Sequence, residues 1–125
     1  MDVTLGEPEV NFARVRDWTA EAARRGSDLV LFPELWSTGY DLENWERYAA
    51  PPGEGMFARL AALAREHHIA LGGSVLEVRD GKAYNAFALF DAEGGSYISG
   101  ADFALAVVDE IENRKHRREQ VGVAY

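Results

Sequence analysis

The sequence predicts an α/β fold with mixed strand pairing. Segments with helical spacing of apolar residues alternate with short apolar runs, in the order helix, strand, helix, strand, strand, and then a further strand and helix. The run at 29–32 is continuously apolar, as in a buried strand. The Asp-Gly pair at 80–81 is typical of a tight hairpin between two strands. Together these features indicate one α/β domain in a chain of 125 residues.

The first helix is predicted to begin near Pro8 and to end before Gly26. Proline fits the first turn of a helix, where its missing N–H is not needed, and Gly26 is a natural C-terminal cap. Residues 1–7 look like a tail that ends in turn chemistry. Helical spacing places one apolar stripe at Phe12, Val15, Thr19 and Ala22, with Trp18 and Ala23 beside it.

The next segment combines a short strand with a long loop. "DLVLF", which begins at Asp28, is expected to be a strand covered on both faces. The segment 35–55 is loop-like, because it contains several glycines and a Pro-Pro pair, and it carries three large aromatic residues. A long irregular loop after a buried strand is more often functional than idle.

The second half repeats the helix-then-strand order and adds a hairpin. "GMFARLAALAREHH" has helical spacing, "IALGGSVLEV" reads as a strand with a glycine-permitted kink, "RDGK" is the turn and "AYNAFALFD" the returning strand. "AEGG" is expected to turn again. Beyond it, "SYIS" and "FALAVV" are strand candidates, and "DEIENRKHRREQV" reads as a solvated helix with Asp109 as its N-cap.

Composition excludes several kinds of function. A net charge of −8 argues against a nucleic-acid partner. The absence of cysteine excludes disulfides, thiolate metal sites and a cysteine nucleophile within this sequence. The adjacent His67 and His68 point in different directions on a helix, so we expect no metal site there, and no motif indicates a cofactor. No apolar run is long enough to span a bilayer, and we expect a soluble, cytoplasmic protein.

Glu34 is the candidate catalytic residue. It follows the apolar strand directly, and α/β folds usually place their sites at the carboxyl ends of strands. Partial burial would disfavour its charged form, which suits a general base, and Pro33 would fix its direction. The alternative is a structural carboxylate that accepts backbone hydrogen bonds or pairs with an arginine. The spacing of the residues alone favours neither the general base nor the structural carboxylate.

Four aromatic or amide residues are candidates for a substrate pocket beside Glu34. Trp36 and Tyr40 lie in the loop that follows it, where lining a pocket and packing in the core are weighed evenly. Tyr84 and Asn85 lie in the returning strand of the hairpin, where we expect them to hold the hairpin against the site.

A family resemblance favours the catalytic interpretation. "GSDLVLFPELWSTGYD" resembles the glutamate motif of the carbon–nitrogen hydrolase family, the nitrilase-like amidases. "NFARVRDWTAEAARRGSDLVLFPE" resembles that family's first helix and second strand, and "ARLAALAREHHIALGGSVLEVRDGKAYNAFALFDAEGG" resembles its next helix and hairpin. The resemblance covers roughly residues 1–100. We therefore expect one domain over 1–125, family-like to residue 100 and divergent over 101–125.

The resemblance implies a fold and a chemistry. The fold is part of a four-layer α-β-β-α sandwich, here a mixed sheet with helices on one face. The chemistry is hydrolysis of non-peptide carbon–nitrogen bonds in amides, carbamoyl compounds or nitriles. In the family a cysteine attacks the carbon, a glutamate acts as general base on the thiol, and a lysine stabilises the tetrahedral intermediate. Glu34 matches the glutamate position.

The departures from the family pattern matter as much as the matches. The family's lysine stretch, of the type Tyr-Arg-Lys-x-His-Leu, does not follow the hairpin, and the cysteine is missing. Lys82 and Lys115 are poor substitutes. We expect a truncated or internally deleted domain that is inactive alone, with a small amide or nitrile as partner if it is active. One alternative is a non-catalytic binding or oligomerisation module that pairs its half-sandwich with a second copy. Another is an enzyme that uses Glu34 as a base on water.

Overall fold

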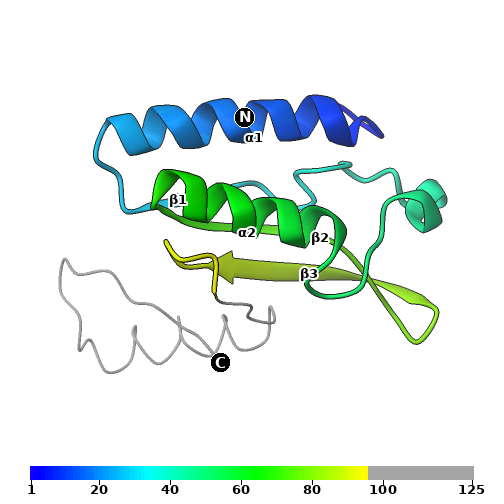
Figure 1. The fold of residues 1–125 in the computed structure, drawn as a ribbon. Helices are drawn as coiled ribbons and strands as arrows, with labels where there is room; N and C mark the ends of the chain where they lie inside the picture. The colour runs from blue at the N-terminus through cyan, green and yellow to red at the C-terminus, as the bar shows by residue number, and fades with distance from the viewer. Residues whose placement is uncertain (96–125) are drawn as a thin grey trace, which may run out of the picture.

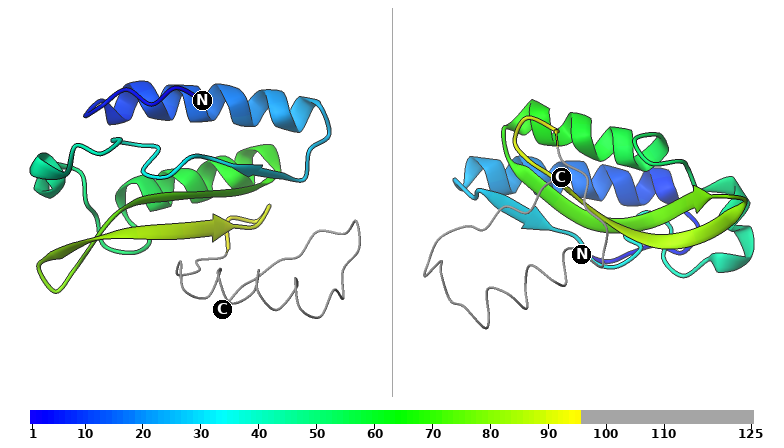
Figure 2. Two further views of the ribbon diagram at one scale, coloured as in Figure 1. Left: turned by 180° about the vertical axis from the view of Figure 1, so that it is seen from behind. Right: turned by 90° about the horizontal axis from the view of Figure 1, so that it is seen from below.

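The computed structural model describes residues 1–95, which form one mixed sheet with two helices on one of its faces (Figures 1 and 2). The expected partial α/β sandwich is thereby confirmed. The strand candidates and the helix predicted beyond residue 95 lie outside the described residues. The elements are α1 (Pro8–Arg24), β1 (Leu29–Leu31), the 3-10 helix η1 (Leu42–Arg47), α2 (Gly55–His67), β2 (Ala70–Arg79) and β3 (Lys82–Phe90).

The sheet has the order β1-β2-β3 and both kinds of pairing. β1 runs parallel to β2, with Leu29 opposite Ala70, and β2 runs antiparallel to β3. The hairpin turn places Asp80 and Gly81 at φ 51° and 70°. Positive φ at both central residues matches the right-handed twist of the flanking strands. The Asp-Gly pair predicted this turn correctly.

Helix α1 begins and ends as its sequence indicates. Pro8 occupies its first turn, and Gly26 adopts φ 79° just after the C-cap. The amide N–H of Ser27 returns to the carbonyl of Ala22 at 3.0 Å, which satisfies a carbonyl at the helix end. Trp18 is 55% exposed, whereas Asn11 is fully buried, so the buried stripe is shifted toward Asn11.

The hydrophobic core lies between the two helices and the covered face of the sheet. Trp36 is fully buried there, with its ring centroid 6.2 Å from those of both Phe12 and Phe32. Arg59 of α2 lies 3.8 Å over the ring of Phe12 and donates hydrogen bonds to Glu9 of α1, so it ties the helices together. The expected stripe of α2 is buried in this core: Phe57, Leu60, Ala61 and Ala64. None of the helices within residues 1–95 has the length and apolarity needed to cross a membrane.

The opposite face of the sheet is not covered by either helix. Leu29 and Leu31 of β1 are 38% and 54% exposed, so the prediction that this strand is covered on both faces is wrong for the described residues. Strand pairing places Leu31 opposite Gly72 and Gly72 opposite Leu89, so these three residues share that face. We call this side the open face. Apolar surface is exposed there at β1, which carries leucine at both outward positions, whereas Leu89 on the same face is buried.

The two adjacent glycines of β2 make room on opposite faces. A Cβ at Gly73 would lie 2.6 Å from Cδ1 and 2.9 Å from Nε1 of Trp36, on the covered face. A Cβ at Gly72 would lie 2.7 Å from Cδ2 of Leu31, on the open face. The core tryptophan therefore requires the absence of a side chain at 73. A Cβ at 72 would also lie 3.0 Å from Cζ of Phe87 and 3.1 Å from Cδ1 of Leu89, so its shortest contact is with the end of an exposed leucine.

Gly73→Ala is expected to destabilise the fold more than Gly72→Ala. The fixed ring of Trp36 cannot withdraw, and overpacking of this kind typically costs about 1–3 kcal/mol. Leu31 can rotate toward solvent, so its matched variant should lose less. Chemical unfolding followed by tryptophan fluorescence measures both free energies of unfolding. Equal losses in the two variants would show that the tryptophan contact does not set the requirement for glycine.

Candidate active site

Glu34 lies where the sequence placed it, three residues after the last residue of β1. Its side chain is exposed, so the expectation of partial burial is wrong. The exposure follows from the open face, since neither helix covers the sheet on that side (Figure 2). Glu34 is thus a solvent-accessible carboxylate at the carboxyl end of a parallel strand, the usual place for a site in an α/β fold.

Both oxygens of the Glu34 carboxylate accept hydrogen bonds from neutral donors. Asn85 of β3 donates from Nδ2 to Oε1 at 2.5 Å, and Tyr40 donates its hydroxyl to Oε2 at 2.6 Å. The three side chains come from the end of β1, from β3 and from the loop after β1. Two donors at separate oxygens fix the plane of the carboxylate and leave further lone pairs for a substrate or nucleophile.

The hydrogen bond to Glu34 changes the pKa of the Tyr40 phenol. Its pKa is raised above the ordinary value, first by the hydrogen bond to Glu34, then by partial desolvation and by the negative charge of the same carboxylate. Tyr40 therefore stays protonated at neutral pH and serves as a donor. It is 64% exposed, so the contact is a positioning hydrogen bond at the rim of the site rather than a buried one.

The backbone turns sharply straight after Glu34. Leu35 is buried and adopts φ 47°, in the left-handed region that a branched side chain rarely occupies. Its N–H donates to the hydroxyl oxygen of Ser74 at 2.8 Å, and its carbonyl accepts the N–H groups of Thr38 and Gly39 at 3.2 and 2.7 Å. The strained residue is thus held by hydrogen bonds on both sides.

A depression of about 310 Å³ opens beside the carboxylate. Both apolar rings and polar groups line it, so it can accept a small molecule with an apolar part and a polar part. Its lining comes from the end of β1 and from the middle of β2 and β3: Phe32, Glu34, Ser74, Asn85 and Phe87.

Two of the sequence-predicted pocket residues lie away from this depression. Trp36 is fully buried in the core. Tyr84 alternates with Asn85 along β3 and so points to the opposite side of the sheet, where the guanidinium of Arg79 lies 4.8 Å over its ring. The structure brings Tyr40 and Asn85 to Glu34, and it adds Ser74 and Phe87, to which the sequence assigned no role.

The loop that carries Tyr40 is anchored by a second carboxylate. Asp41 accepts the hydroxyl of Tyr48 at 2.8 Å and the amide of Asn44 at 2.8 and 3.0 Å. The hydrogen bond to Asp41 raises the pKa of Tyr48, with smaller contributions from desolvation and nearby charges. The single hydroxyl hydrogen of Tyr48 is shared with the carbonyl of Gly6, which lies 3.3 Å from the same oxygen, so the loop also contacts the N-terminal segment.

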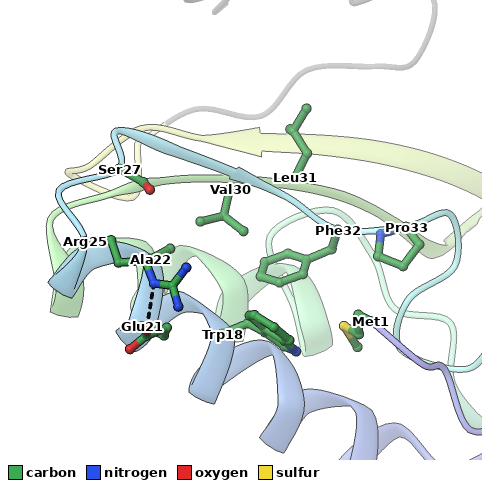
Figure 3. A pocket seen from close by; sticks show the side chains of 10 residues that line it. All are labelled: Met1, Trp18, Glu21, Ala22, Arg25, Ser27, Val30, Leu31, Phe32 and Pro33. Atoms are coloured by element: carbon green, nitrogen blue, oxygen red, sulfur yellow. Dashed lines mark hydrogen bonds and ion pairs between the residues drawn. The ribbon is translucent and has the colours of Figure 1, made fainter.

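A second hollow of about 350 Å³ lies between α1 and β1 (Figure 3). Val30 and Phe32 point from β1 toward the helix, whereas Leu31 points to the other side of the strand. Its charged groups are already paired, because Arg25 bonds to Glu21 at 2.6 Å. Within residues 1–95 no three His, Cys, Asp or Glu side chains gather as metal ligands, in this hollow or elsewhere.

A comparison with known protein families shows the family to which the chain belongs. The sequence profile of the family described as carbon-nitrogen hydrolase matches residues 1–117. The chain belongs to the carbon–nitrogen hydrolase family. The match continues past residue 100, whereas the division into a family-like part and a divergent tail stays a prediction.

Two curated relatives and one solved structure show which members are similar. The chain is 31% identical over 94 residues to the 2-oxoglutaramate amidase of Bacillus subtilis (strain 168), covering 74% of this chain and 36% of that protein. It is 37% identical over 101 residues to an omega-amidase of Xenopus tropicalis, covering 79% and 36%. The amidase from Nesterenkonia sp. AN1, solved with acrylamide added at its active-site cysteine, superposes with a TM-score of 0.63 at 25% identity, covering 74% and 37%. The chain thus spans little more than a third of the length of each of these three proteins.

Glu34→Gln is expected to lower the pKa of Tyr40 toward about 10, the ordinary phenol value. The variant removes the negative charge and weakens the hydrogen bond. In the native chain the pKa is higher folded than unfolded. The contribution of this contact to stability is therefore complete below about pH 10 and is lost as the pH rises through the folded-state value.

Carbon-13 NMR of the tyrosine Cζ atoms, titrated with pH, measures this shift. Tyr48 is the internal control, because its pKa is raised by Asp41 and should not move in the variant. An unchanged Tyr40 titration would show that the two side chains are not hydrogen-bonded in solution.

Proposed function

We propose that Glu34 is the general base of an amidase-type carbon–nitrogen hydrolase site. The observation that carries this proposal is the carboxylate itself, exposed at the end of β1 and held by Asn85 and Tyr40 at the edge of a small depression. A base must be oriented toward the proton that it removes, and two neutral donors supply this orientation. The stretch that resembles the family's glutamate motif contains the same residue, which supports the proposal.

The substrate class follows from the family and from the size of the depression. Relatives named as amidases support a small amide, with carbamoyl compounds and nitriles as further candidates. The rings of Phe32 and Phe87 would contact the apolar part of such a molecule, and its carbon–nitrogen group would lie toward Glu34. We propose no metal, cofactor or nucleic-acid partner for this reaction.

The proposed reaction requires a nucleophile in addition to the base. In the family mechanism the base takes a proton from a cysteine thiol, the sulfur attacks the carbon of the substrate, and the nitrogen leaves as ammonia or an amine. The sequence of 125 residues contains no cysteine. We therefore propose that this chain by itself carries the base and does not form the thioester.

Ammonia release from a panel of simple amides, carbamoyl compounds and nitriles tests this proposal. We expect no release from the purified chain or from its Glu34→Gln variant, because a base alone cannot replace the covalent step. Release that disappears in the variant would show that Glu34 activates water directly, and the requirement for a separate nucleophile would be wrong.

A graft tests the base role directly. Residues 1–95 would replace the matching segment of the Nesterenkonia amidase, which has an active-site cysteine. In this chimera Glu34→Gln should reduce amide hydrolysis by about 10²–10⁴-fold, the usual contribution of a general base. Glu43→Gln, an exposed carboxylate in η1, is the matched control and should retain activity. Equal activity in both variants would exclude Glu34 as the base.

A second candidate function is self-association without catalysis, which the open face favours. Leu29 and Leu31 expose apolar surface, and β1 is an edge strand among the described residues. The carbonyl of Asp28 and the N–H of Phe32 form hydrogen bonds with β2. Along a strand the backbone groups of successive residues point alternately to its two sides, so every second residue between these two has backbone groups that face the unpaired edge. A second copy of the chain would cover both the leucines and this edge.

Light scattering after gel filtration tests this second candidate. We expect the chain to be a discrete dimer and its Leu31→Lys variant to be a monomer, because a charge on the open face opposes its burial. Leu42→Lys is the matched control, since Leu42 is 50% exposed and Leu31 is 54% exposed. A monomeric native chain, or a dimer that survives Leu31→Lys, would exclude association through this face.

A further inference from the structure

The hydroxyl of Ser74 is buried beside the site and has a specific backbone partner. Ser74 is 7% exposed and lies in β2, opposite Phe87 of β3, so its side chain points to the open face. Its oxygen accepts the N–H of Leu35 at 2.8 Å, across a separation of 39 residues. The donor is the first backbone N–H after Glu34, so this hydrogen bond fixes the peptide unit that joins Glu34 to the following turn.

The turn at Leu35 needs such a partner because its backbone conformation is unfavourable. A leucine at φ 47° is strained by contact between its Cβ and the backbone. Its N–H would also be a buried, unpaired donor without Ser74. The carbonyl of Leu35 is held by the loop itself, whereas its N–H is held from β2.

We infer that Ser74 is a positioning residue for the Glu34 carboxylate, acting through the backbone of Leu35. Ser74 lies in β2 and Asn85 in the neighbouring β3, so two strands of the sheet fix the position of Glu34. Asn85 holds its side chain, and Ser74 holds the peptide unit behind it. This inference rests on the proposed role of Glu34 as a base, but its test does not depend on activity.

The inference explains why a serine stands between apolar neighbours at an outward position of β2. The neighbouring outward positions of the open face carry leucine and phenylalanine, which need no hydrogen-bond partner. An alanine at 74 would fit the same space but could not accept the Leu35 N–H. A hydroxyl close to the strand backbone is the smallest side chain that reaches this donor.

The test compares Ser74→Ala with Ser74→Thr, which keeps the hydroxyl. Two quantities are measured: the hydrogen-exchange rate of the Leu35 amide and the pKa of Tyr40, which reports on the position of Glu34. In Ser74→Ala we expect Leu35 exchange to accelerate on the order of tenfold, as for the loss of one hydrogen bond. We also expect the Tyr40 pKa to fall toward its ordinary value, while Tyr48 is unchanged. Ser74→Thr should restore both.

A merely structural serine would behave differently. Faster exchange at Leu35 with an unchanged Tyr40 pKa would show that Ser74 supports the turn without positioning Glu34, and the inference would be wrong. No change in either quantity would also overturn it. If Ser74→Ala does not fold, Ser74→Cys replaces it, because the thiol is a weaker acceptor and should give a smaller shift of the Tyr40 pKa than the alanine. Two results together would refute the base role and leave the positioning role of Ser74 intact. They are a lowered Tyr40 pKa in Ser74→Ala and an unchanged rate of amide hydrolysis in the Glu34→Gln variant of the chimera.

Discussion

The reversal of the chain at Leu35 is the constraint on which both the core and the candidate site depend. Glu34 must face solvent and Trp36 must enter the core, and they are only two residues apart. A left-handed residue between them achieves this change of direction. The strain is balanced because the same turn buries the side chains of Leu35 and Trp36 and satisfies the backbone groups of Leu35. Stability and the geometry of the carboxylate therefore come from one local structure.

Local signals in the sequence predicted most of the fold. Pro8, Gly26 and the Asp-Gly turn act through the backbone preferences of single residues, and the spacing in α2 acts through one helix. The coverage of β1 could not be predicted in this way. An apolar run has the same sequence whether one face or both faces of the strand are covered. The coverage of β1 depends instead on which distant elements pack against it.

The candidate site was predictable only in part, for a related reason. Glu34 was predicted from its place after a strand and from the resemblance to the family motif. The choice between Tyr84 and Asn85 depends on which residue of β3 points to the open face, and a shift of register by one residue would reverse it. The hydrogen bond from Leu35 to Ser74 joins residues that are distant in the sequence, so no local pattern could indicate it.

Neutral partners together with exposure beside a depression separate Glu34 from the structural carboxylates of the chain. An arginine or lysine would also fix the side chain, but its positive charge would oppose the arrival of a proton at the same oxygen. Elsewhere among residues 1–95 the half-buried Asp41, which anchors a loop, also accepts hydrogen bonds from a phenol and an amide, whereas Glu9, Glu21 and Glu77 are each paired with an arginine. Glu34 is instead held by an amide and a phenol, which provide direction without cancelling its charge. A carboxylate that is oriented and accessible has the geometry that a general base requires before its nucleophile arrives.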